Sequence, residues 1–149
     1  MARSRSYREL IAWQKSMRLA KAAYRISQEL PRKEAYGLIS RMQQAAVSVP
    51  SNIAEGHGKL TDLQFRPFLG NARGSLCELH TQVELACDLG YISSDKLKGF
   101  MEQSSEVARL INGLINSLRE VRSVAKKILT PLTARSAANS ASSAKKEPF

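Results

Sequence analysis

Apolar residues recur at alternating steps of three and four along most of the chain, a spacing typical of helices that pack in a bundle. No stretch alternates apolar and polar residues over the length of a strand. Turns that contain proline or glycine divide the pattern into four helical segments, at about residues 8–30, 36–58, 62–89 and 95–128. The pattern therefore predicts an all-α fold with four bundled helices.

The second segment, residues 36–58, has a core face made of small and medium-sized apolar side chains. Pro50 lies within this pattern, and because the apolar spacing continues past it, we expect a bend in one helix and not a break into two. This helix also has an unusual amount of uncharged polar surface, which faces either solvent or another subunit. The expected core residues are Leu38, Met42, Ala45, Ala46, Val49 and Ile53.

The first segment carries two apolar stripes. Two stripes indicate either a wide core face or a helix that also packs against something outside its own core. The first stripe has the spacing of a bundle seam and consists of Leu10, Trp13, Met17, Ala20 and Tyr24. The second stripe consists of Ala12, Ser16, Leu19, Ala23, Ile26 and Leu30.

The third segment has a candidate N-cap at Thr61 or Asp62. Proline is favoured in a first helical turn, so Pro67 predicts that the regular helix begins only at about residues 64–66. Gly70 and Gly74 each cost about 1 kcal/mol relative to alanine, which predicts a close approach of another helix there. The expected core stripe is Phe65, Phe68, Leu69, Ala72, Leu76, Leu79, Val83 and Ala86.

The fourth segment begins at Ser93 or Ser94 as N-cap and extends to Ile128. It is longer than the first segment, so we expect its last turns to project beyond the bundle. Basic residues in those turns either complement the helix dipole or form a prong that binds phosphates. These residues are Arg119, Arg122, Lys126 and Lys127.

The composition changes at both ends of the chain. Residues 1–6 form a basic N-terminus that we expect to be flexible, and residues 7–129 form the four-helix bundle domain. Residues 130–149 are mainly Ser, Ala, Lys and Asn, which cannot bury enough apolar area to fold alone, so they predict a disordered basic tail.

The chain has a formal net charge of +10, which favours polyanionic partners such as nucleic acid. Each end contributes +2, which leaves +6 for the residues between them. Residues 1–10 lack the apolar segment of a secretion signal, and no apolar run approaches the roughly 20 residues that a membrane span needs. Cys77 and Cys87 lie about 15 Å apart along one helix and cannot form a disulfide within a subunit. We therefore expect a reduced, cytoplasmic protein without a membrane association.

No catalytic, metal-binding or cofactor-binding motif is present in the sequence. His80 shares one side of its helix with Cys77, Glu84 and Cys87, which are residue types that bind zinc. However, residues ten apart on a straight helix cannot reach one ion, and no other helix supplies a matching pair. We therefore predict no catalytic residues, no metal and no cofactor, and we expect His80 at the helix surface beside Glu84.

The block AAVSVPSNIAEG at residues 45–56 is the most specific part of the sequence. Together with residues 10, 12–14, 34–38, 68–69, 72, 74–75, 78–79, 81–82 and 89–92, it lies within a span of about 7–120. These residues resemble a known family, the four-helix bundle proteins encoded in intervening sequences of bacterial large-subunit ribosomal RNA genes. The chain is similar as well to the accessory variability determinant protein of diversity-generating retroelements.

The resemblance implies an antiparallel four-helix bundle that assembles as a ring-like homopentamer. With the long fourth helix and the flexible C-terminal tail predicted from the residues, we expect an all-α, antiparallel up-and-down four-helix bundle. For the retroelement member it implies basic surfaces that bind nucleic acid and a reverse transcriptase partner. No catalytic residues come with the family.

We hypothesise a non-enzymatic, oligomeric bundle that binds RNA or other nucleic acid without base-specific readout. No aromatic stacking platform is visible in the sequence, which argues against a module that reads bases. The main alternative is a protein-interaction scaffold, such as an accessory subunit for a reverse transcriptase, and a small-molecule-binding bundle comes third. The candidate phosphate contacts are Lys15, Arg18, Lys21 and Arg25 on the first helix, and Arg119, Arg122, Lys126 and Lys127 on the fourth.

Overall fold

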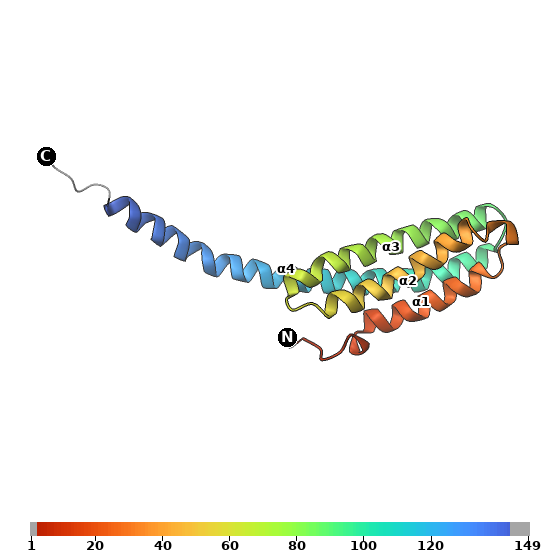
Figure 1. The fold of residues 1–149 in the computed structure, drawn as a ribbon, viewed down its shortest axis with the longest axis horizontal. Helices are drawn as coiled ribbons and strands as arrows, with labels where there is room; N and C mark the ends of the chain where they lie inside the picture. Colours follow the sequence, from red (N-terminus) through yellow and green to blue (C-terminus); the bar gives the residue numbers. More distant parts are fainter. Residues whose placement is uncertain (1–2, 144–149) are drawn as a thin grey trace. The chain divides into compact units, whose positions relative to one another are not determined.

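A computed structural model describes the backbone of residues 3–143 and the side chains of residues 3–119 and 127–129. The chain divides into two units, residues 1–115 and 116–149. Two short 3-10 helices precede and follow the first α-helix (Figure 1). In chain order, the helices are η1 (Tyr7–Glu9), α1 (Ile11–Ser27), η2 (Arg32–Glu34), α2 (Leu38–His57), α3 (Asp62–Asp88) and α4 (Ser94–Ser143).

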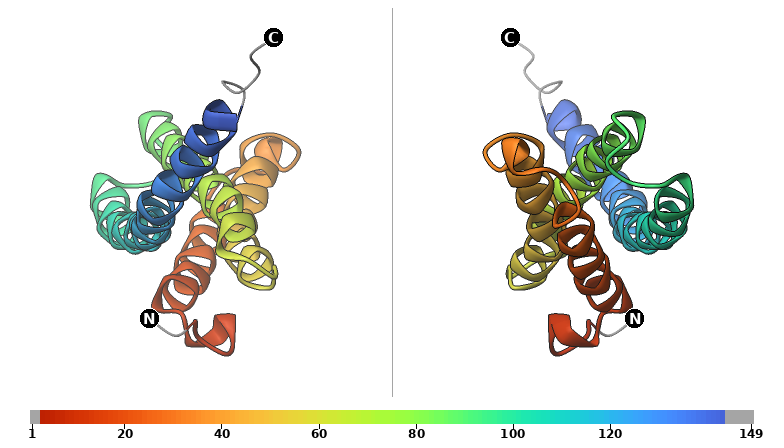
Figure 2. Two further views of the ribbon diagram at one scale, coloured as in Figure 1. Left: turned by 90° about the vertical axis from the view of Figure 1, so that its left-hand side faces the viewer. Right: turned by 90° about the vertical axis from the view of Figure 1, so that its right-hand side faces the viewer.

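The first unit is an antiparallel up-and-down four-helix bundle, which confirms the predicted fold class (Figure 2). α1 packs against α2, and α2 packs against α3. α4 closes the bundle between α1 and α3. Lys15 Nζ lies 3.4 Å from Glu106 Oε1, and Arg73 Nη1 donates a 3.2 Å hydrogen bond to Asn112 Oδ1. α1 and α3 therefore occupy opposite corners of the bundle, each between α2 and α4. None of the described helices contains a stretch with the length and hydropathy that a membrane span requires.

α1 begins three residues later than the sequence predicted. Tyr7–Glu9 forms the 3-10 helix η1, because the Ser6 hydroxyl accepts a hydrogen bond from the backbone N–H of Arg8 and caps that turn. The α-helix starts after Leu10, whose extended backbone separates the two elements.

α1 turns its second apolar stripe to the core, so the assignment of the first stripe to the bundle seam was wrong. The first stripe is half-buried or exposed, with 39% of Tyr24 accessible. A polar residue is tolerated in the buried stripe because Ser16 Oγ donates a 2.5 Å hydrogen bond to the Ala12 carbonyl, which satisfies the hydroxyl inside the helix. The buried residues of α1 are Ala12, Ser16, Leu19, Ala23, Ile26 and Ser27.

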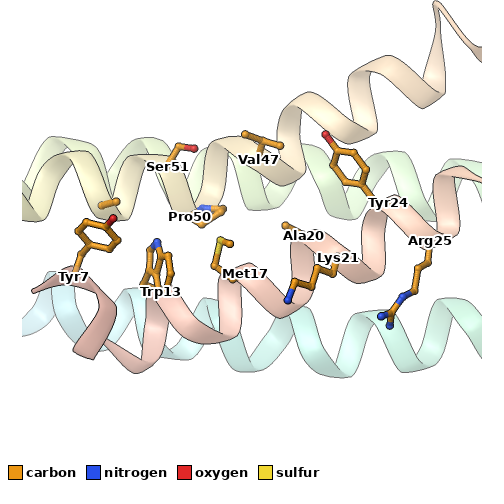
Figure 3. Close-up of a pocket in the computed structure, with 11 residues that line it drawn as sticks. Tyr7, Trp13, Met17, Ala20, Lys21, Tyr24, Arg25, Val47, Pro50 and Ser51 are labelled. Atoms are coloured by element: carbon orange, nitrogen blue, oxygen red, sulfur yellow. The ribbon is translucent and has the colours of Figure 1, made fainter.

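α2 is one continuous helix through Pro50, as predicted. Figure 3 shows that it changes direction in the turn that carries Val47, where proline removes a helical hydrogen bond. All six predicted core residues of α2 are buried. Near its C-terminal end, Gly56 packs directly on α3. A Cβ atom there would lie 2.5 Å from Phe68 Cβ and 2.7 Å from Phe65 Cδ2, so only glycine permits this approach of the two helices.

α3 begins at Asp62 with Thr61 as its N-cap. Thr61 Oγ1 accepts a hydrogen bond from Gln64 N, and Gln64 Oε1 accepts one from Thr61 N, which completes a capping box. This cap starts the helix before the point predicted from Pro67, which lies in the second turn and not in the first. The predicted core stripe is buried except for Phe68, which is half-buried against Gly56.

α4 begins after Ser93, whose hydroxyl accepts a hydrogen bond from Lys96 N. The turn before it contains Gly90 at a φ of 79°, a left-handed conformation that glycine adopts readily after the end of a helix. α4 continues to Ser143, so it is longer than the predicted helix that ended at Ile128. The flexibility of residues 130–149 and the projection of the last turns stay predictions. The buried residues in the first unit's part of α4 are Phe100, Ser104, Val107, Ile111 and Ile115.

Candidate interaction surfaces

An open apolar groove runs between α1 and α2 on the outside of the bundle, with a volume of about 640 Å³. In Figure 3, Trp13 and Met17 of α1 point toward Pro50 of α2, while the ends of Lys21 and Arg25 extend away from these three side chains. The groove contains the exposed stripe of α1, which the core does not use. Of the two interpretations of the double stripe, the structure therefore favours a helix that presents a second apolar face outward. The other lining residues are Tyr7, Ala20, Tyr24, Val47, Ser51 and Ala54.

The N-terminal segment closes one end of the groove. The Tyr7 ring of η1 lies edge-on to Trp13, with 5.2 Å between ring centroids, and the Arg8 guanidinium lies 5.0 Å from the Tyr7 ring centre. Arg3 Nη2 donates to the His57 carbonyl at 2.5 Å and its guanidinium lies 5.5 Å from the Phe65 ring centre. Arg3 therefore contacts the bundle, and the flexibility of residues 1–6 stays a prediction.

The four predicted basic residues of α1 come together around one hollow between α1 and α4. This basic hollow has a volume of about 400 Å³ and is lined by Lys15, Arg18, Lys21 and Arg25 together with Gln103 and Glu106. The single carboxylate pairs with Lys15 at 3.4 Å. Four cations against one carboxylate leave a net charge of +3, and no aromatic side chain lines the hollow. Lys21 and Arg25 border both the hollow and the apolar groove.

The predicted basic residues of the fourth helix belong to the second unit, which is described by itself. Arg119 and Lys127 are exposed. The side chains of Arg122 and Lys126 lie outside the described residues. Phosphate binding by these four residues stays a prediction.

The outer face of α3 was interpreted wrongly from the sequence. Gly70 and Gly74 were expected to allow a close approach within the bundle, but both are exposed, and a Cβ atom at either would have no neighbour within 4 Å. Beside them, a polar depression separates α2 from α3. There the Ser48 and Ser75 hydroxyl groups lie 2.7 Å apart, and the exposed Glu78 lines the edge.

His80 lies between α3 and α4 and not at the helix surface. It is half-buried, and its Nε2 contacts the hydroxyl of the buried Ser104. Burial lowers the pKa of His80, and the Glu84 carboxylate opposes that shift. Neither Cys77 nor Cys87 forms a disulfide. Among the described residues, no group of three or more His, Cys, Asp or Glu side chains is placed to hold a metal ion.

The lowered pKa of His80 predicts a pH-dependent stability. The folded state favours the neutral imidazole, so this contribution is fully present above the unfolded pKa of about 6.5 and is lost as the pH falls below it. We expect the free energy of unfolding, measured with urea at pH 7.5 and 5.5, to decrease more in the wild type than in His80→Gln. Equal decreases in the two proteins would show that protonation of His80 is not linked to folding.

Comparison with known proteins identifies a family and a fold. The family model described as 23S rRNA-intervening sequence protein matches residues 8–113. A crystal structure at 1.70 Å resolution, of a protein with unknown function from the S23 ribosomal protein family of Bacteroides thetaiotaomicron, aligns with a TM-score of 0.66 and 19% sequence identity. The alignment covers 70% of this chain and 98% of that one, and at this identity it shows a shared fold. No curated protein matches the chain. Neither match points to an enzyme family.

Proposed function

The chain belongs to the 23S rRNA-intervening sequence protein family, and from this premise and the charge on α1 we propose that it is a non-enzymatic, self-associating bundle that binds nucleic acid through the basic hollow. The observation that carries the proposal is the convergence of Lys15, Arg18, Lys21 and Arg25 on one hollow with a single carboxylate. Ammonium and guanidinium groups form charge-assisted hydrogen bonds with phosphate oxygens. The ligand is therefore the sugar-phosphate backbone of RNA or DNA.

The geometry of the hollow favours binding without base readout. Lys15 and Arg25 are ten residues apart on one helix, so the cations extend over about 15 Å. Because no aromatic side chain lines the hollow, bases have no surface on which to stack. We expect similar affinities for unrelated sequences, and self-association multiplies modest contacts per subunit into useful avidity.

Salt dependence tests this proposal. Each neutralised phosphate contributes a slope of roughly −0.7 to −0.9 to log K against log salt, so three phosphates predict about 20- to 40-fold weaker binding between 50 and 200 mM salt. Lys15→Gln/Arg18→Gln should reduce the magnitude of the slope by about 1.5 for every sequence alike. Binding is measured by fluorescence anisotropy with unrelated RNA and DNA oligonucleotides. We choose glutamine and not glutamate because a carboxylate at position 15 would repel Glu106.

A matched control uses the same two residue types elsewhere on the bundle. Lys98 and Arg109 are exposed on α4 and line a separate surface depression, so Lys98→Gln/Arg109→Gln should leave the slope unchanged. Identical slopes for both double variants, or no binding by the wild type at low salt, would exclude the basic hollow as a nucleic-acid site.

A second candidate function is a protein-interaction scaffold, and the apolar groove favours it. Trp13, Met17 and Val47 leave apolar area accessible on the outside of a domain whose core is already formed by the opposite stripe. Such a groove is typical of surfaces that bind helices of other proteins, including an accessory role beside an enzyme such as a reverse transcriptase. A scaffold without a nucleic-acid role would bind neither RNA nor DNA in the salt titration.

A further inference from the structure

The helix that forms one wall of the apolar groove and the C-terminal half of α3 carry opposite charge. Residues 10–28, which contain α1, include four Lys or Arg and no carboxylate. Residues 75–89, in the C-terminal half of α3, include three carboxylates and no Lys or Arg. Glu78, Glu84 and Asp88 are all exposed. In a chain with a net charge of +10, residues 75–89 therefore form an acidic segment, on the helix opposite the most basic one, and Glu78 is its carboxylate on the side toward α2.

These two surfaces lie at the same level along the bundle. Tyr24 of α1 and Val47 of α2 line the groove together, and Gln43 Nε2 donates to Ser27 Oγ at 3.1 Å one turn away. The next residue after Val47 is Ser48, whose hydroxyl lies 2.7 Å from that of Ser75 on α3. Gly74 and Glu78 are therefore level with the groove and with its two basic residues, Lys21 and Arg25.

We propose that the outer face of α3 in a second copy of this chain occupies the apolar groove between α1 and α2. In this contact, Glu78 of the second copy lies beside Lys21 and Arg25, and the exposed Leu85 adds apolar area. The proposal rests on the self-association included in the proposed function, and it assigns the two surfaces that form the contact.

Two observations favour a second copy over another occupant. Two copies that are related by rotation about an axis parallel to the helices contact each other at the same level along that axis. The groove and the α3 face lie at the same level, so they satisfy this condition. Gly70 and Gly74 have no neighbour within 4 Å of a Cβ position, so the backbone of α3 is free to approach the groove of another copy closely. Of the charged residues that line the α2–α3 depression, Glu78 of α3 supplies the carboxylate and Arg41 of α2 supplies a cation.

Gly74→Leu tests the contact without touching the core. The open space at Gly74 admits leucine within the monomer, and replacing a helical glycine favours the helix. We therefore expect a folded variant whose thermal midpoint at low concentration, where both proteins are monomers, is at least that of the wild type. At concentrations where the wild type is larger, the variant should sediment as the 16.5 kDa monomer. Gly99→Leu is the matched control, since Gly99 is an equally open, exposed glycine on α4, and it should sediment like the wild type.

A charge exchange provides an independent measurement. Arg25→Glu and Glu78→Arg should each weaken self-association at least about tenfold, and the double variant should recover it, because opposite charges meet again. A monomeric wild type at 100 μM, or unchanged assembly in Gly74→Leu together with no recovery in the double variant, would overturn the inference. Nucleic-acid binding is measured separately with Lys15→Gln/Arg18→Gln, which do not line the groove, so either proposal can fail while the other holds.

Discussion

Gly56→Leu should lower the free energy of unfolding of the bundle by about 3 kcal/mol or more. This loss is a large fraction of the total stability of a domain of this size. Even the first added carbon would lie 2.5 Å from Phe68 Cβ, and that atom is fixed to the α3 backbone. Relief requires α3 to move away from α2 near the α2–α3 turn, which would disrupt the packing of the buried Phe65. The free energy of unfolding, measured by circular dichroism in urea, reports the effect.

The control for this substitution is the same change at Gly70. Gly70 is exposed, and nothing lies within 4 Å of its Cβ position, so Gly70→Leu should leave monomer stability equal or raise it by up to about 1 kcal/mol. If Gly56→Leu and Gly70→Leu had similar stabilities, the close approach of α2 and α3 at Gly56 would be contradicted.

Leu19→Ala should cost about 2–5 kcal/mol of unfolding free energy, while Met17→Ala on the same helix should cost about 1 kcal/mol or less. Leu19 is 1% exposed in the core, so truncation removes buried apolar area and leaves a cavity. Met17 is only half-buried and lines the open groove, where solvent replaces the lost atoms.

The comparison of these two variants tests which stripe of α1 forms the core. Both substitutions remove a large apolar side chain and introduce alanine, so helix propensity changes little between them. Urea unfolding at low protein concentration measures the monomer and separates this effect from self-association. A larger loss for Met17→Ala would mean that the bundle buries the Trp13 and Met17 stripe instead.

The assignment of the two α1 stripes shows where sequence periodicity stops being informative. Both stripes have helical spacing, and the one with Trp13 and Met17 has the larger side chains. The core nevertheless contains Ala12, Ser16 and Leu19, because small residues let α1 approach its neighbours and the Ser16 hydroxyl is satisfied by the Ala12 carbonyl. Spacing identifies an apolar face, but the choice between two such faces depends on tertiary packing.

Sequence patterns that act within a few residues predicted the helices more reliably than the choice between two apolar stripes. The capping box of Thr61 and Gln64 determines the start of α3, whereas Pro67 alone suggested a later start. The core face of α2 was predicted correctly across Pro50, because one apolar stripe continues on both sides of it.

Of the two candidate surfaces on α1, the basic hollow could be predicted from a local pattern and the apolar groove could not. The basic hollow was predictable because Lys15, Arg18, Lys21 and Arg25 repeat at helical spacing on one face. The apolar groove joins η1, α1 and α2, and no local pattern brings Tyr7 beside Trp13 or Pro50 beside Met17. The sequence also showed Gly70 and Gly74, but only the folded chain reveals that both face outward.

The charges of the four helices polarise the bundle across its width. α1 carries four cations and α3 has an excess of carboxylates, while the cations and carboxylates are equal in number in α2 and in residues 94–115 of α4. Since α1 and α3 occupy opposite corners, the domain has an electric moment perpendicular to its long axis. Such a moment orients molecules before they touch, over a distance of about 8–10 Å at physiological ionic strength. Under the proposed function, this moment turns the α1 corner toward a polyanion, and in the proposed contact between copies it turns the α1 corner of one copy toward the α3 corner of the other.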